Sequence, residues 1–173
     1  MKKEVIAETF TPFYDPTEDR IKLIINYQSA DKRIDFMITR AFIINFVPAF
    51  DDYLLQYYPQ EALASQEKLS SRKTTQAVTE TYNDKKSPQQ KDKREESKIT
   101  ATDNANMQLF TQEPELLIKT DFIYDKNSKK TTLIFSGKKS TAKATLTYLM
   151  MEQLIGTIKT AIPNFSWGIA QNF

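Results

Sequence analysis

The chain of 173 residues contains no cysteine, no histidine and only three glycines. The missing cysteines exclude disulfides and thiol nucleophiles, and the missing histidines exclude the commonest general base and, with cysteine, the usual zinc ligands. Three scattered glycines cannot form a G-x-G-x-x-G or P-loop motif for nucleotide phosphates. We therefore predict no metal, no bound cofactor and no catalytic residue, and we expect that the protein is not an enzyme.

Long apolar runs are also absent. No stretch approaches the roughly 18 uninterrupted apolar residues of a transmembrane helix, and the N-terminal MKKEVIAETFTPFYD lacks the apolar core of a secretory signal. The net charge of +2, from 24 basic and 22 acidic residues, is too balanced to indicate nucleic-acid or membrane binding by itself. We expect a cytoplasmic protein without a membrane span.

The composition changes sharply in the middle of the chain. Residues 64–108 are dominated by polar and charged side chains, and Tyr82 is their only aromatic residue. Such a segment cannot bury enough apolar surface to offset the entropy lost on ordering. We predict a disordered linker here, with some helix at residues 60–69, between two units at residues 1–63 and 109–173 that share one core.

The first unit reads as strands followed by a helix. VIAETFTPFY suggests one strand, which Pro12 places at a sheet edge. RIKLIINYQ and RIDFMI alternate apolar and polar residues around the turn SADK, which predicts a hairpin. Thr39 is a suitable N-cap for a helix that ends near Tyr58 and is expected to kink at Pro48.

The second unit repeats this order. MQLFTQ suggests a short strand, and LLIKTDFIY and TTLIFS predict a hairpin around DKNSKK. Ser140 or Thr141 is expected to cap a helix from about Ala142 to Ala161, which Pro163 terminates. The predicted fold class is α+β, with two β-β(-β)-α units that can be related by a pseudo-two-fold axis and antiparallel sheets packed on two main helices.

Two segments resemble each other. Ile21–Ile38 and Ile118–Phe135 align without a gap at an offset of 97 residues, the difference between 118 and 21. Duplication explains the match, and so does the alternation that any half-buried hairpin requires. Both explanations stay open at the level of sequence.

Two groups of aromatic residues are candidate partner-binding sites. One group surrounds a helical turn and consists of Tyr53, Tyr57 and Tyr58. The other group lies in the C-terminal tail and consists of Phe165, Trp167 and Phe173. Large aromatic side chains are common anchors in protein interfaces. The alternative for the tail is that it folds back over the core. The leading hypothesis is a non-enzymatic protein–protein interaction module, an adaptor or assembly subunit, that forms homo-oligomers or binds another protein.

A nucleic-acid-associated protein is the alternative hypothesis. Residues 109–173 contain 8 basic and 5 acidic residues, a net charge of +3, whereas residues 1–63 contain 7 basic and 10 acidic, a net charge of −3. Six lysines are expected near one end of the second hairpin, where they could contact phosphate: Lys126, Lys129, Lys130, Lys138, Lys139 and Lys143.

The acidic residues have ordinary explanations. Asp15, Glu18 and Asp19 are close enough to hold a divalent cation, but an exposed turn at Asp-Pro is the favoured interpretation. Asp51 and Asp52 diverge by about 100° on a helix and fit a solvated face. Asp35, between two core positions of a strand, is expected to face solvent.

Overall fold

The computed structural model describes residues 2–67 and 113–169. The first half contributes β1 (Lys3–Ile6), β2 (Phe10–Asp15), β3 (Arg20–Ile25), β4 (Ile34–Ile38) and α1 (Arg40–Tyr57), followed by a helical segment over residues 59–67. The second half contributes β5 (Glu115–Leu116), β6 (Lys119–Asp125), β7 (Lys130–Ser136), β8 (Ser140–Leu146), α4 (Tyr148–Ala161) and α5 (Asn164–Trp167). The predicted α+β class is confirmed.

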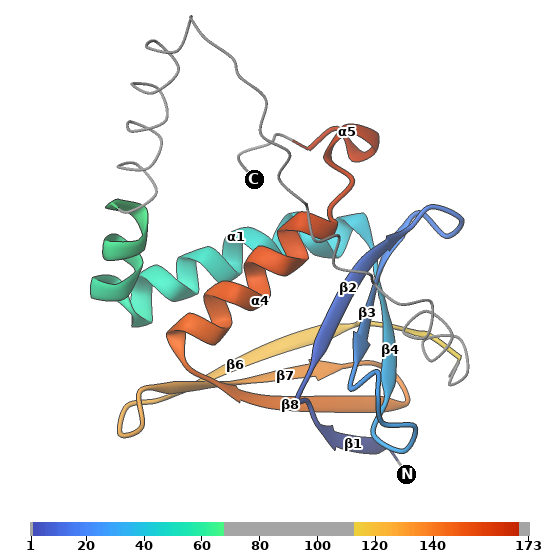
Figure 1. Ribbon diagram of the computed structural model, residues 1–173, viewed down its shortest axis with the longest axis horizontal. Helices are drawn as coiled ribbons and strands as arrows, with labels where there is room; N and C mark the ends of the chain where they lie inside the picture. The colour runs from blue at the N-terminus through green and yellow to red at the C-terminus, as the bar shows by residue number, and fades with distance from the viewer. Residues whose placement is uncertain (1, 68–112, 170–173) are drawn as a thin grey trace, which may run out of the picture.

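The strands form two four-stranded sheets, in the orders β1-β8-β7-β6 and β2-β3-β4-β5 (Figure 1). The consecutive strands β2, β3 and β4 pair antiparallel, as do β6, β7 and β8, whereas the edge strands β1 and β5 pair parallel with β8 and β4. Each sheet is therefore mixed, and each contains the first strand of the other half. Pro12 lies in β2, at a sheet edge as predicted, where its missing N–H removes no ladder bond from a central strand.

The long helices α1 and α4 lie on the same side of both sheets (Figure 1). Thr39 caps α1 as predicted, because its hydroxyl accepts the backbone N–H of Phe42 at 3.2 Å. Thr147 does the same for α4, accepting the N–H of Met150. Buried apolar residues of both sheets and both helices form one continuous cluster. The partly buried Phe10 of the first half packs against it, with its ring centroid 5.7 Å from that of Phe135 of the second half.

Two element boundaries differ from the sequence prediction. The predicted N-terminal strand is two strands, β1 and β2, which belong to different sheets. The predicted helix start at Ala142 is instead β8, in which Ala142, Ala144 and Leu146 are buried while Lys143 and Thr145 are exposed. The alternation of buried and exposed residues that a strand requires outweighs the helix preference of alanine in this segment. The predicted strand MQLFTQ lies outside the described residues.

The internal repeat is real in topology, but its predicted offset is wrong. Ile21–Ile38 spans β3 and β4, the third and fourth strands of the first half, whereas Ile118–Phe135 spans β6 and β7, the second and third strands of the second half. The equivalent hairpins are β2–β3 and β6–β7, at an offset of 110 residues. Their turns match closely: Asp15 pairs with Arg20 and Asp125 with Lys130 across the strands.

The matching turns also share backbone conformation. Asp19 and Lys129, again 110 residues apart, both have positive φ, at 49° and 51°. Asp15 and Asp125 each accept the backbone N–H two residues later, at 3.0 Å. The same turn is thus built twice from different residues.

Candidate functional site

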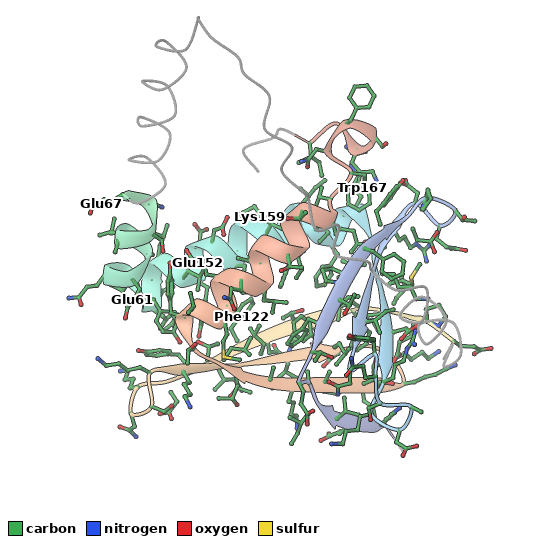
Figure 2. All side chains as sticks on the ribbon, in the orientation of Figure 1. Glu61, Glu67, Phe122, Glu152, Lys159 and Trp167 are labelled. Carbon is green, nitrogen blue, oxygen red and sulfur yellow. The ribbon has the colours of Figure 1, made fainter. Side chains whose placement is uncertain are left out.

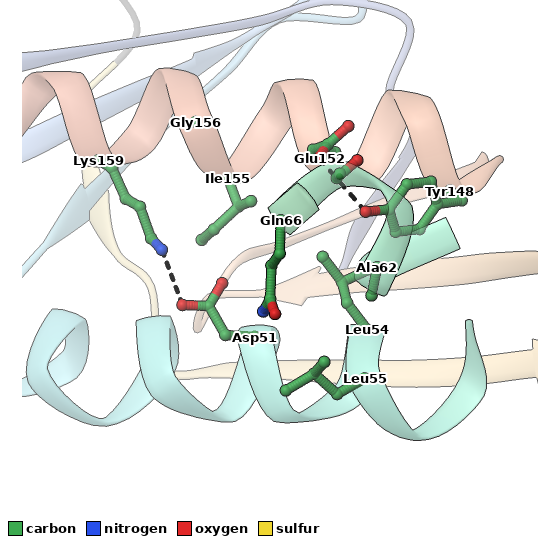
Figure 3. A pocket seen from close by; sticks show the side chains of 11 residues that line it. Asp51, Leu54, Leu55, Ala62, Gln66, Tyr148, Glu152, Ile155, Gly156 and Lys159 are labelled. Atoms are coloured by element: carbon green, nitrogen blue, oxygen red, sulfur yellow. Dashed lines mark hydrogen bonds and ion pairs between the residues drawn. The ribbon is translucent and has the colours of Figure 1, made fainter. Parts of the chain in front are cut away.

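A pocket of about 330 Å³ lies between α1, α4 and the segment 59–67 (Figure 3). Apolar side chains make much of its lining, with polar groups at its ends: Asp51, Leu54, Leu55, Ala62, Ser65, Gln66, Tyr148, Glu152, Ile155, Gly156 and Lys159. A concave site of this size, mostly apolar with a few polar groups, is typical of a binding site.

The polar groups of the pocket pair with each other, once between the helices and once within α4. Lys159 Nζ lies 2.7 Å from Asp51 Oδ2 and joins α4 to α1, and the Tyr148 hydroxyl donates to Glu152 at 3.3 Å (Figure 3). Asp51 therefore takes part in an ion pair between the halves, whereas Asp52 is exposed as expected. The Lys159–Asp51 pair is half-exposed, so we expect it to contribute little to stability.

Tyr148 lies at the acidic end of the pocket. Burial raises the pKa of its phenol most, the hydrogen bond with Ser65 lowers it, and the charges of Glu152 and Glu61 raise it further. The phenol is therefore neutral at pH 7 and serves as a hydrogen-bonding group. The charge at this end of the pocket is negative.

Gly156 leaves the wall of α4 open. A Cβ built at this position meets nothing within 4 Å, so no close approach requires glycine. Glycine within a helix costs about 0.5–1 kcal/mol relative to alanine. The missing side chain exposes the helix backbone between Glu152 and Lys159, which share this face of α4.

The predicted tyrosines lie on the face of α1 that meets β6. The ring centroid of Tyr53 lies 4.7 Å from that of Phe122. The ring centroids of Tyr57 and Tyr58 lie 5.1 and 5.3 Å from that of Tyr124. Tyr58 is buried and Tyr57 is 37% exposed. The structure thus brings the three together against the other half of the chain, and leaves part of Tyr57 accessible.

Thr131 connects two of these tyrosines and was missed by the sequence analysis. Its buried hydroxyl lies 3.0 Å from the Tyr53 hydroxyl and 2.9 Å from that of Tyr58. Burial raises the pKa of both phenols, and the hydrogen bonds with Thr131 oppose that shift. Threonine on a strand is common, so no signal in the sequence identifies this one.

The tail residues are separated by the structure. Trp167 is buried, and its indole N–H donates to Asp19 at 2.7 Å, next to the edge of the Tyr14 ring (Figure 2). The tail therefore folds back, which was the alternative prediction. Phe165 is fully exposed, and Phe173 lies outside the described residues.

The six predicted lysines do not lie near one end of the hairpin, which corrects that expectation. Lys126, Lys129 and Lys130 surround the β6–β7 turn, whereas Lys138 and Lys139 follow β7 at its other end. The strand between them spans about 20 Å, at about 3.3 Å per residue. The sixth, on β8, pairs with a glutamate of β1 at 3.1 Å.

The acidic residues of the first half have structural roles. Asp15 accepts backbone N–H groups of its turn, and Asp19 binds Tyr14 and Trp167. The expectation that Asp35 faces solvent is wrong, because it is 2% exposed and its carboxylate lies 2.7 Å from Arg33 Nε. Alternation placed Asp35 on the sheet face that points away from the helices, but that face is buried at this position. Ile24, on the same face, is also buried.

Within residues 2–67 and 113–169, no three acidic side chains converge in a way that could hold a metal ion. In the same part of the chain, no helix combines the length and apolarity needed to cross a bilayer. The fold is α+β, and the pocket lies in its helical layer. The chain matches no protein-family model and has no significant match among curated proteins or solved structures.

Proposed function

We propose that this chain is a non-enzymatic protein–protein interaction module that self-associates through the end of the molecule where α1 finishes and α4 begins. One observation carries the proposal: apolar, acidic and basic side chains all reach the surface at this end. We call it the end surface and define it by Leu55, Tyr57, Leu63, Leu149, Glu61, Glu152, Lys126, Lys129 and Lys130.

The apolar part of the end surface lies around the pocket. Leu55 lines the pocket and is 42% exposed, and Leu63 on the segment 59–67 is 56% exposed. Leu149 is 58% exposed and shares a face of α4 with Glu152 and Gly156, because these residues are three and seven positions apart. Apolar side chains gathered on one surface favour association.

The charged part of the end surface is self-complementary. Glu152 lines the pocket (Figure 3), and Glu61 is close enough for its charge to act on Tyr148, which also lines it. The lysine-rich β6–β7 turn lies at the same end, because the Tyr58 hydroxyl at the end of α1 donates to the Lys129 carbonyl at 3.4 Å. In a two-fold dimer, the acidic side of each copy can therefore face the basic turn of the other. An interface of this kind closes on itself.

The test is the mass of the protein in solution as a function of concentration, measured by size-exclusion chromatography with light scattering. We expect a dimer that Leu149→Glu converts to a monomer. Ile123→Glu is the matched control, because Ile123 is 55% exposed but lies on the opposite face of β6 from Phe122. A wild-type monomer at every concentration, or equal effects of both variants, would overturn the proposal.

Charge reversal sharpens the same test. Lys126→Glu with Lys130→Glu makes the basic turn acidic, and Glu61→Lys with Glu152→Lys makes the acidic side basic. Each doubly substituted chain should lose self-association through like-charge repulsion, and a mixture of the two should form a heterodimer. Failure of the mixture to associate would remove the role assigned to charge. The nucleic-acid alternative stays a prediction, with its lysines divided between two ends of β7.

A further inference from the structure

The two halves of the chain complete each other's sheets. β1 of the first half pairs with β8 in a parallel register from Lys3↔Ser140 to Ile6↔Lys143, and the Ala7 N–H extends the contact to the Lys143 carbonyl at 2.8 Å. β5 of the second half pairs with β4, and the Leu117 N–H donates to the Met37 carbonyl at 3.0 Å. Neither sheet is complete within one half.

The helices cross between halves in the same way. On α1, the rings of Phe46, Phe50 and Tyr53 pack around that of Phe122 of β6, with ring centroids at 6.2, 5.4 and 4.7 Å. In return, α4 packs against β2 of the first half. The largest apolar contacts of each helix therefore lie on the opposite half.

An aromatic residue beyond each long helix also docks at the other half's hairpin. Tyr58, after α1, binds Thr131 and the Lys129 carbonyl at the β6–β7 hairpin. Trp167, after α4, binds Asp19 and packs on Tyr14 at the β2–β3 hairpin. The contacts between the halves are thus reciprocal, as in a dimer of two similar subunits.

We infer that the two halves, residues 2–67 and 113–169, are complementary partners that assemble without a covalent connection. It follows that two copies of this chain can assemble by exchanging halves. Each half alone exposes unpaired strand edges and an apolar helix face that the other half covers. A separate half is therefore unstable and associates readily with a complementary half. Such exchange uses only contacts already present within one copy.

The distance between the ends of the two halves determines how short the connection must be to force exchange. β5 lies beside β4, which leads directly into α1, whereas Ser65 lies beside Tyr148 at the far end of α1. An 18-residue helix is about 27 Å long. A connection of 45 residues, 68–112, can span that distance within one copy. One of four residues reaches only about 15 Å, so it would force halves of different copies to pair.

The first experiment cuts the folded full chain. A site for a sequence-specific protease is inserted at residue 90, and the cut protein is analysed by size-exclusion chromatography with light scattering. In a Leu149→Glu background, which removes the end surface, we expect one species with the intact mass of 20.0 kDa and unchanged Trp167 fluorescence. Two separating fragments with loss of that fluorescence signal would overturn the inference.

The second experiment deletes residues 70–110 in the same background. We expect a defined dimer whose circular dichroism spectrum is that of the folded wild type, because each sheet and core is built from two copies. A chain in which 68–112 is replaced by 45 glycine and serine residues is the control and should remain a monomer. A folded monomer after deletion would overturn the inference, and if the deletion variant precipitates, the cut chain decides. Since the background lacks Leu149, failure here is distinct from failure of the end surface.

Discussion

The connections β3–β4 and β7–β8 occupy equivalent places in the two halves. Each anchors the strand contributed by or to the other half, β1 or β5, but one connection uses a side chain and the other a backbone N–H. In the first half the connection spans residues 26–33, and the side chain of Asn26 binds the backbone that leads from β1 to β2. In the second half it spans residues 137–139, and the backbone N–H of Lys139 binds the side chain of Glu115 in β5 at 2.7 Å. A shared topology therefore requires an anchor at this place and leaves its chemistry free.

The anchor of the first half is the more extensive one. Asn26 has φ of 54° and is 5% exposed. Its amide oxygen accepts the N–H groups of Glu8 and Thr9 at 2.8 and 3.2 Å, and its NH₂ group donates to the carbonyls of Ile6 and Lys32 at 2.7 and 3.3 Å. All four hydrogen-bonding sites of the amide are used. The path of the chain from one sheet to the other depends on this side chain.

Replacing that anchor should produce the largest loss of stability. We expect Asn26→Ala to lower the free energy of unfolding by about 3 kcal/mol, because several partly buried backbone groups lose their partner and alanine is strained at positive φ. Asn26→Gly should recover about 1 kcal/mol of this loss by relieving the strain. The measurement is urea unfolding followed by Trp167 fluorescence.

Ser136 is the control, because it lies 110 residues after Asn26. Its backbone N–H and carbonyl belong to the β7 ladder, and its side chain makes no hydrogen bond within the described residues. We expect Ser136→Ala to change stability by less than about 0.5 kcal/mol. An equal effect of Asn26→Ala and Ser136→Ala would contradict the anchoring role assigned to Asn26.

The anchor of the second half depends on a close approach at Gly137. A Cβ there would lie 2.9 Å from Cε1 of the buried Phe36 ring and 2.5 Å from Cδ of Glu115. We expect Gly137→Ala to lower the free energy of unfolding by about 1–3 kcal/mol, because the ring has no room to move. Gly156→Ala is the control and should have the opposite sign, raising stability by about 0.5–1 kcal/mol. Urea unfolding of both variants decides the comparison, and a loss at both positions would contradict it.

The sequence predicted the elements that local pattern determines. β3, β4 and α1 with its Thr39 cap follow from alternation, helical spacing and capping. No local pattern in the sequence indicates that β1 and β5 pair with strands of the other half. Lys3 and its partner Ser140 are far apart in the chain, and β5 has only two residues. Parallel pairs of this kind are set by tertiary packing alone.

The candidate site was predicted less well than the fold. The three tyrosines were found through their helical spacing, but their partners on β6 were not. The pocket residues Glu152, Gly156 and Lys159 share a face of α4 and were missed. They lie inside the predicted helix, but helical spacing alone does not show which of its residues face α1 and the segment 59–67. Asp35 was misplaced because alternation distinguishes two faces of a strand but not whether the second face is covered.

The docking of Tyr58 on the second hairpin gives the third prediction. Its hydroxyl donates to the Lys129 carbonyl or shares a hydrogen bond with Thr131. We expect Tyr58→Phe to lower the free energy of unfolding by about 1–2 kcal/mol, because Thr131 is buried and loses a partner. Tyr57→Phe is the control, since Tyr57 is 37% exposed and its hydroxyl forms no hydrogen bond within the described residues. Equal effects of the two substitutions in urea unfolding would refute this role for Tyr58.

The equivalent docking on the first hairpin should differ in its response to acid. Hydrogen bonds from Tyr14 and then from Trp167 lower the pKa of the Asp19 carboxyl below its ordinary value of 3.8. Because the pKa is lowered in the folded state, the stabilisation is present above the unfolded pKa and is lost as the pH falls through the folded pKa. The Lys129 carbonyl, which takes the same place for Tyr58, does not titrate.

Acid should therefore loosen Trp167 before it affects the hairpin bound by Tyr58. As the pH falls from about 5 to about 2, we expect the emission of Trp167, the only tryptophan, to shift to longer wavelength while the far-ultraviolet circular dichroism still reports the folded sheets. The change should be local and small, because Asp19 is exposed. In Asp19→Asn this step should disappear, since the neutral amide can still accept the indole N–H but has no charge to lose. The same acid step in Asp19→Asn as in the wild type would mean that another carboxylate controls the tail.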